Sequence, residues 1–310
     1  SINCVPLWLK GILFNDRISM SFNLEKMNKV PREAQFFDVN GLWYFFNGWL
    51  VRILYPTPIT PNQITFLSLV LGLLSAGFYV SGKPDALVWG AVFLYGKVIL
   101  DNVDGNLARA RGASSRFGRF LDSLADFLVT VLVYIGATFY LVQETGDIGL
   151  WYLGFFALLF GFIQSTYFVF YLVSYTSSLG SYEKNRVDET ITQEDKAAAE
   201  KNGSFFWDLK LQRLFIWAYG WQDRLVERLD FFSRKASKVS EKEEAEWYGD
   251  KGFLTAISPL CLCTNNVMLA VFSLIGQVEL FFILSISMMN FYGTGLLIWK
   301  IQKWKSTRPA

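Results

Sequence analysis

The sequence predicts an all-α, polytopic integral membrane protein: a six-transmembrane-helix bundle preceded by an N-terminal interfacial helix. Three observations lead to this fold class. Of the 310 residues, 52% are hydrophobic and only 18% are charged, which is too apolar for an ordinary soluble domain. Six apolar segments are long enough to cross a bilayer. The basic residues, finally, are concentrated in the segments on one side of these spans.

These observations divide the chain into four parts. Residues 1–58 form an N-terminal cytoplasmic and juxtamembrane segment, and residues 59–178 carry the first four spans with an acidic motif. Residues 179–251 form a polar cytoplasmic insert with an amphipathic helix, and residues 252–310 carry the last two spans and a basic tail. No cleavable signal peptide is expected, because the first 20 residues lack a basic start followed by a sustained apolar run.

The region before the first span is rich in aromatic residues. Phe36–Tyr55 combines them with few charges, a composition typical of a helix lying in the plane of the lipid headgroups. Thr60, Pro61 and Gln63 then predict a helix start, since they supply an N-cap, a first-turn proline and a capping box. Asn62 lies among the first amides of this helix, where a phosphate can be held. Simple capping is the open alternative.

The six expected spans cover about residues 61–80, 85–105, 118–142, 150–175, 253–275 and 278–301. Lys97 lies inside the second span, so it must snorkel to the interface or pair with an acid or a phosphate. Polar side chains in the last two spans, at Asn265, Asn266 and Asn290, are expected to face the interior of the bundle.

Four acids cluster at neighbouring ends of the second and third spans. Asp101 and Asp104 are three residues apart and Asp122 and Asp126 four apart, so each pair projects from one face of a helix. We expect all four carboxylates to point into one pocket. Their mutual repulsion near hydrocarbon calls for protonation or a bound cation. Carboxylate oxygens in a chain without His favour Mg²⁺, Mn²⁺ or Ca²⁺ over Zn²⁺.

Small residues and an arginine accompany the acids. Gly105, Ala108 and Gly118 leave room for a flat ligand against the backbone, although close helix packing is the open alternative. Arg109 can meet an anion. Cys261 and Cys263 have no further Cys pair or His to complete a zinc site, and they are interpreted as small buried apolar residues.

The complete pattern D-x2-D-G-x2-A-R-x8-G-x3-D-x3-D, from Asp101 to Asp126, resembles the signature of the CDP-alcohol phosphotransferase (phosphatidyltransferase) family at every fixed position. The resemblance covers roughly residues 40–180 closely. It implies two divalent metal ions, Mg²⁺ or Mn²⁺, a CDP-linked donor, and CMP as a product. The residues that it assigns to the metals are Asp101, Asp104, Asp122 and Asp126. Those expected at the CDP and its phosphates are Asn62, Gly105, Ala108, Arg109 and Gly118.

The resemblance also implies a reaction. An integral membrane enzyme of phospholipid biosynthesis would transfer a substituted phosphate group from a CDP-linked donor, with CDP-diacylglycerol favoured, to an alcohol hydroxyl and release CMP. Asp126 would be the general base, with metal ligation alone as the alternative. In the other reaction orientation a CDP-linked headgroup passes to a lipid alcohol. Either way one substrate is a membrane lipid.

Two other classes of membrane protein also use intramembrane acids. Intramembrane prenyltransferases carry Asp-rich motifs but lack the Ala-Arg and the second half of this pattern. Cation transporters are expected to spread their acids over several helices near mid-membrane, whereas these acids cluster at one end of two adjacent spans. Both classes are less favoured.

Basic residues predict the orientation. Of the 29 Lys and Arg residues, only Lys83 falls in a loop opposite the motif, which places the motif, the insert and both termini in the cytoplasm. Within the insert, Phe205–Phe232 predicts a helix on the membrane surface with a break at Gly220. A solvated or oligomer-forming role for it, including a homodimer, stays open. No nucleic-acid partner is expected.

Overall fold

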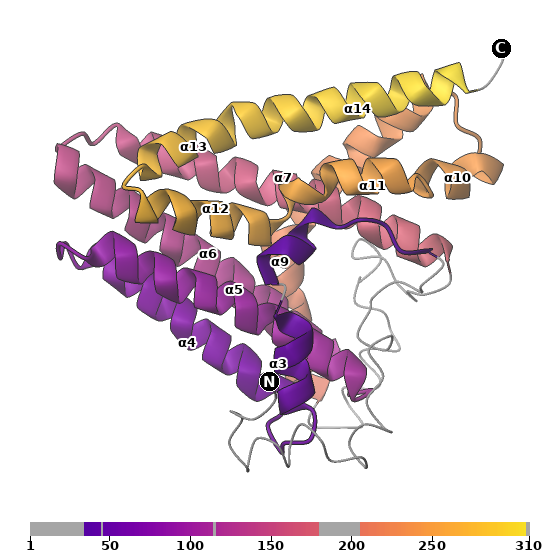
Figure 1. The fold of residues 1–310 in the computed structure, drawn as a ribbon. Helices are drawn as coiled ribbons and strands as arrows, with labels where there is room; N and C mark the ends of the chain where they lie inside the picture. Colours follow the sequence, from indigo (N-terminus) through magenta and orange to yellow (C-terminus); the bar gives the residue numbers. More distant parts are fainter. Residues whose placement is uncertain (1–33, 45, 114–115, 180–204, 308–310) are drawn as a thin grey trace, which may run out of the picture.

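The computed structural model describes residues 34–44, 46–113, 116–179 and 205–307, and this part of the chain contains helices and turns but no strand (Figure 1). The predicted all-α fold class is therefore confirmed. Residues 1–33 and 180–204, which include most of the expected N-terminal surface segment and the start of the insert, lie outside the described residues.

Among the longest helices, α4 packs against both α5 and α6, and α6 packs against α7 (Figure 1). Two short elements come first, η3 (Val39–Tyr44) and α3 (Asn47–Leu54). The remaining helices are α4 (Pro61–Val80), α5 (Ala86–Ala110), α6 (Arg116–Thr145), α7 (Leu150–Ser178), α9 (Phe205–Ala236), η5 (Glu241–Glu243), α10 (Glu244–Tyr248), α11 (Lys251–Ile257), η6 (Ser258–Leu260), α12 (Leu262–Leu274), α13 (Val278–Ile286) and α14 (Met288–Ser306).

In the described residues, five helical segments are long and apolar enough to cross a membrane: Pro61–Val80, Ala86–Ala110, Gly118–Thr145, Leu150–Ser178 and Val278–Ser306. Lys251–Leu260 and Leu262–Leu274 meet at an angle of 41° and provide a sixth if this bent pair is one span. The protein is thus a polytopic helical membrane protein, as predicted. The bend follows Pro259, which removes a backbone donor from the helix ladder.

Local sequence explains how the first long helix begins. The Thr60 side chain accepts a hydrogen bond from the backbone N–H of Gln63, and the Gln63 side chain accepts one from the backbone N–H of Thr60. Pro61 occupies the first helical position. The predicted capping box is therefore present, and it satisfies two amides that would otherwise lack a helical partner.

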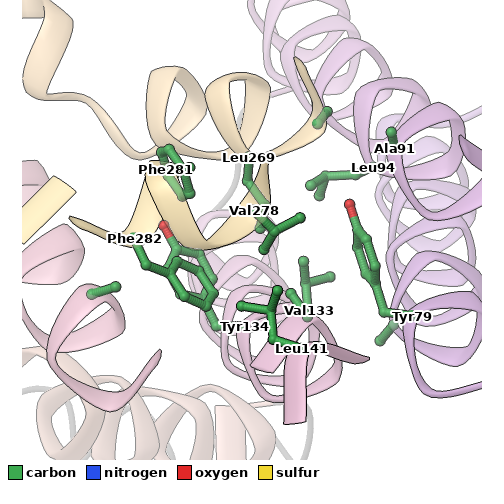
Figure 2. Packing of buried hydrophobic residues seen from close by; sticks show 14 of the residues in the cluster. Tyr79, Ala91, Leu94, Val133, Tyr134, Leu141, Leu269, Val278, Phe281 and Phe282 are labelled. Atoms are coloured by element: carbon green, nitrogen blue, oxygen red, sulfur yellow. The ribbon is translucent and has the colours of Figure 1, made fainter. Parts of the chain in front are cut away.

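The core lies where helices α4, α5, α6, α7, α12 and α13 converge, and Figure 2 shows part of it. Tyr79 of α4, Leu94 of α5, Tyr134 of α6, Leu269 of α12 and Phe282 of α13 are all at most 2% exposed. Tyr134 and Phe282 stack with their ring centroids 5.5 Å apart. This cluster joins the last spans to the first three and so holds the acid-bearing ends of α5 and α6 in fixed positions.

Small residues allow the close approach of helices that membrane bundles favour. A Cβ added at Gly154 of α7 would lie 1.9 Å from Thr138 Oγ1 of α6, and one at Gly72 of α4 would lie 2.4 Å from Val129 Cγ1 of α6. At these two positions only hydrogen fits between the helices. α6 is therefore packed tightly on both sides just beyond the segment that carries its acids.

The structure differs from the sequence prediction in two details of the amphipathic segments. Phe36–Tyr55 is not one interfacial helix: it contains the separate elements η3 and α3, and Val51 of α3 is fully buried against α5. α9 passes through Gly220 without a break. It also packs on α6 and α7, because its apolar stripe matches the apolar faces of those helices as well as it would match lipid. Asn265 and Asn266, each 2% exposed, face the interior as expected, and Asn290 does so by accepting a hydrogen bond from Gln164.

A buried carboxylate connects α9 to the rest of the molecule. Asp230 of α9 is 1% exposed and accepts hydrogen bonds from the Tyr171 hydroxyl at 2.7 Å, Trp247 Nε1 at 3.0 Å, the Tyr248 hydroxyl at 2.6 Å and Arg234 Nε at 2.8 Å. These donors come from α7, α10 and α9 itself. The insert is thus fastened to the bundle by a satisfied polar network rather than by apolar contact alone.

Candidate active site

A cavity of about 670 Å³ lies where the end of α5 meets the start of α6. The N-terminal segment and the helices α3, α7, α9 and α12 complete its wall. The residues that line it are Gln35, Phe36, Asp38, Asn40, Asn47, Lys97, Val98, Asp101, Asn102, Gly105, Asn106, Arg109, Arg119, Asp122, Ser123, Asp126, Phe162, Ser165, Thr166, Phe168, Val169, Leu172, Val173, Thr176, Phe215, Tyr219, Gln222, Cys261, Leu262, Cys263 and Asn266.

Three of the four predicted carboxylates reach this cavity. Asp101 comes from α5, and Asp122 and Asp126 come from α6. The Lys97 ammonium donates to Asp101 Oδ1 at 2.8 Å and also to Asp126 Oδ1. Lys97 therefore pairs with acids, one of the alternatives that its depth in the span allowed, and it joins the two acid-bearing helices.

Asp104 is placed differently from the other three. It is 3% exposed, does not line the cavity, and accepts a hydrogen bond of 2.5 Å from the Thr65 hydroxyl of α4. The expectation that all four carboxylates point into one pocket therefore needs correction for Asp104. The reason is that α4 packs closely along α5 and offers a hydroxyl donor on the Asp104 side of the helix.

Of the three small residues of the motif, Gly105, Ala108 and Gly118, only Gly105 lies in the cavity wall. Gly105 lines the cavity, and the three atoms nearest to a Cβ added there, the first at 3.4 Å, all belong to the Arg109 guanidinium. A side chain at this position would thus contact the arginine of the motif. Ala108 and Gly118 are half-buried and Asn62 is exposed, and the structure places none of these three in the cavity wall.

Arg109 ends a chain of amide side chains along one wall. Arg109 Nη2 donates to Asn106 Oδ1 at 2.5 Å, Asn106 Nδ2 donates to Asn102 Oδ1 at 2.8 Å, and Asn47 Nδ2 of α3 donates to the same Asn102 oxygen at 2.6 Å. Sequence reasoning missed the three asparagines. A signal existed, because Asn102 and Asn106 are four residues apart on the helix face that also carries Arg109.

The insert was not predicted to reach the site, yet α9 supplies part of the wall. Phe215, Tyr219 and Gln222 line the cavity, and the Tyr219 hydroxyl donates to the backbone oxygen of Ser123 on α6 at 2.7 Å. Cys261 and Cys263 also line it and are only half-buried, so their interpretation as buried packing residues is wrong. The bend between α11 and α12 is what brings them to the cavity.

The N-terminal segment closes the cavity on another side. Asn40 Nδ2 donates to the backbone oxygen of Ser258 at 2.9 Å, and the Thr264 hydroxyl donates to Asn40 Oδ1 at 2.6 Å. Trp43 Nε1 donates to the Thr264 hydroxyl oxygen at 3.0 Å. Residues far apart in the sequence are thus held together beside the acids.

Whether the cavity suits a metal ion depends on its donor set and on its present contacts. Within the described ranges, no three His, Cys, Asp or Glu side chains are grouped closely enough to hold an ion. The chemistry of the set nevertheless fits a hard divalent cation, because Asp101, Asp122 and Asp126 supply carboxylate oxygens to one cavity. Two of these three carboxylates are at present paired with Lys97.

Fold and cavity together define a polytopic helical membrane protein with a carboxylate-rich internal site. Residues 58–187 match the family described as CDP-alcohol phosphatidyltransferase. This is the family whose signature the acidic motif resembles.

Curated proteins with similar sequences match over limited stretches. The CDP-diacylglycerol–serine O-phosphatidyltransferase of Mycobacterium leprae is 41% identical over 68 residues, 22% of this chain and 22% of that protein. The archaetidylinositol phosphate synthase of Pyrococcus horikoshii is 39% identical over 79 residues, 25% of this chain and 40% of that protein. Cholinephosphotransferase 1 of Gallus gallus is 35% identical over 98 residues, 29% of each. The chain thus spans between about a fifth and two fifths of the length of these relatives.

Proposed function

We propose that the protein is a metal-dependent CDP-alcohol phosphotransferase of phospholipid biosynthesis. It transfers a substituted phosphate group from a CDP-linked donor to an alcohol hydroxyl and releases CMP. The observation that carries this proposal is that Asp101, Asp122 and Asp126 of the motif line one cavity together with Gly105 and Arg109. The family match and the names of the relatives support the class of reaction.

CDP-diacylglycerol is the donor that we favour. The serine phosphatidyltransferase names this lipid, whereas cholinephosphotransferase 1 points to the transfer of a choline phosphate headgroup. The second orientation remains the alternative reaction, and either one makes one of the two substrates a membrane lipid. In both, a divalent cation bound by the cavity carboxylates would neutralise charge on the diphosphate and on the departing CMP.

The residues of the chain then have separate roles in the reaction. Asp126 takes the proton from the acceptor hydroxyl, the hydroxyl oxygen forms a bond to phosphorus, and the bond from that phosphorus to the CMP oxygen breaks. Arg109 holds a positive charge beside the phosphates. The cavity beside Gly105 accommodates the donor. Asp101, Asp122 and Asp126 would hold the cation, and Asp104 supports the site through Thr65 of α4.

The cytoplasm is the proposed location of the site, the insert and both termini. The turns α4–α5, α6–α7 and α12–α13 gather at one end of the bundle, on the left in Figure 1, away from α10 and the end of α14. Lys83 lies in the first of these turns, and the α6–α7 turn carries no basic residue. Because Lys and Arg near a span resist translocation, the opposite end is cytoplasmic.

Accessible cysteines test this orientation. In a chain with Cys4, Cys261 and Cys263 replaced by serine, Ile148→Cys in the α6–α7 turn and Lys242→Cys in η5 introduce thiols at exposed positions. We expect an impermeant maleimide to label Lys242→Cys only from the cytoplasmic side and Ile148→Cys only from the other side. Labelling of both from one side would contradict the topology between α7 and α9.

The reaction itself is tested by CMP release from purified protein. CDP-diacylglycerol with a panel of polar alcohols, and CDP-linked headgroups with diacylglycerol, distinguish the two orientations. We expect CMP from one arm only, with turnover that stops in excess EDTA and returns with Mg²⁺ or Mn²⁺. Full turnover in EDTA, or no CMP in any arm, would exclude the proposed chemistry.

A further inference from the structure

Lys97 is buried among the motif acids, although it is not itself part of the motif. Its side chain is 3% exposed, it lies one helical turn before Asp101 on α5, and it lines the cavity. The ammonium donates to Asp101 Oδ1 at 2.8 Å and to Asp126 Oδ1 on α6. One cation thus bridges the two helices that carry the motif.

The electrostatic surroundings explain why a lysine is tolerated at this depth. Taking an ammonium out of water carries a large desolvation penalty, which only closely paired opposite charges offset. The Asp126 carboxylate interacts electrostatically with the carboxylates of Asp101 and Asp122. Their mutual repulsion would destabilise the junction between α5 and α6 unless a positive charge lies among them.

A hard divalent cation would use the same oxygens. Asp101 and Asp126 cannot give their Oδ1 lone pairs fully to an ion while those oxygens accept from Lys97. The ammonium and the ion also repel each other at so short a range. Binding of an ion to these carboxylates must therefore displace Lys97 or proceed against its charge.

We propose that Lys97 is a positioning residue that competes with the divalent cation for Asp101 and Asp126, and so sets the affinity of the site for the ion. Its ammonium holds the two carboxylates together and neutralises them until an ion takes its place. This inference rests on the proposed function only in taking a divalent cation as the ligand of these carboxylates. It concerns ion binding and does not require that the donor or acceptor be known.

Mn²⁺ binding to Lys97→Met tests the competition directly. Free Mn²⁺ is counted by electron paramagnetic resonance with protein in nanodiscs and without nucleotide. We expect Lys97→Met to bind Mn²⁺ at least about tenfold more tightly than the unmodified protein, because a unit positive charge beside the ligands is gone. Lys97→Arg, which keeps the charge, should stay near the original affinity. Lys83→Met, at an exposed turn position, is the matched control and should leave the affinity for Mn²⁺ unchanged.

Thermal unfolding provides a second measurement. In EDTA, Lys97→Met should have a much lower melting temperature than the unmodified protein, because the carboxylates of Asp101 and Asp126 then repel each other with no cation between them. Saturating Mn²⁺ should raise the melting temperature of Lys97→Met most of the way to that of the unmodified protein. The melting temperature of the unmodified protein should rise less when Mn²⁺ is added. The double variant Lys97→Met with Asp101→Asn removes one charge of each sign and should melt in EDTA above the single variant.

Several results would overturn the proposal. Equal or weaker Mn²⁺ binding by Lys97→Met would show that Lys97 and the ion do not compete. Weaker donor binding with unchanged Mn²⁺ affinity would assign Lys97 to the donor diphosphate instead. A Lys97→Met protein that stays unfolded at saturating Mn²⁺ would show that the ion does not replace the ammonium. If the unmodified protein releases no CMP and Lys97→Met still binds Mn²⁺ more tightly, the proposed function fails and this inference stands.

Discussion

Asp126→Asn is expected to reduce kcat for CMP release by about 10²–10⁴-fold, the usual contribution of a general base. Asparagine has nearly the same shape but cannot take the proton of the acceptor hydroxyl. Asp126 lines the cavity beside Asp122 and Asp101, so the substitution should leave most contacts with the donor in place. Donor affinity measured by calorimetry with metal present should therefore change by no more than a few-fold.

Asp101→Asn provides the comparison that separates chemistry from binding. Asp101 is a proposed ligand of the cation, and the cation in turn would hold the donor diphosphate. Removing the charge of Asp101 should therefore weaken the binding of metal and of donor together. Asp85→Asn is a matched control, because Asp85 is exposed at the start of α5 and its side chain makes no capping hydrogen bond. If Asp126→Asn loses the donor as completely as Asp101→Asn does, Asp126 acts as a metal ligand alone and the base must be sought elsewhere.

Asp230→Ala is expected to lower the free energy of unfolding by about 3–5 kcal/mol, the cost of breaking a buried, hydrogen-bonded charge network. The substitution removes the acceptor of Tyr171, Trp247, Tyr248 and Arg234 at once. Burial, together with the Asp230 carboxylate, raises the pKa of Tyr248 well above its usual value, so its hydroxyl remains a donor at neutral pH and is left without its acceptor.

A denaturant titration in detergent, followed by the fluorescence of the tryptophans, measures this loss. Glu227→Ala lies on the same helix at an exposed position and should change the free energy of unfolding by less than about 0.5 kcal/mol, as is usual for surface substitutions. Because α9 also lines the cavity with Phe215, Tyr219 and Gln222, we expect Asp230→Ala to reduce turnover as well. A stability equal to that of Glu227→Ala would mean that α9 is held by its apolar contacts alone.

Local patterns in the sequence determined the fold class and the first long helix. The length of an apolar run shows whether a helix can cross a bilayer, and the confirmed spans follow from it. The capping box at Thr60 and Gln63 forms as predicted because all of its atoms belong to one short segment. The spacing of the acids also placed Asp101, Asp122 and Asp126 correctly at neighbouring helix ends, since helix periodicity depends on the backbone alone.

Only the tertiary structure decided which partner each of these side chains meets. Asp104 belongs to the same motif as Asp101, yet it accepts from Thr65 because α4 lies against that side of α5. Lys97 of α5 reaches Asp126 of α6 because α4 packs against both of these helices and holds them close to each other. α9, predicted for the membrane surface, also packs on α6 and α7 and lines the cavity. An apolar stripe satisfies lipid and protein equally well, and contacts between helices depend on how the helices cross, which the spacing of residues within one helix does not specify.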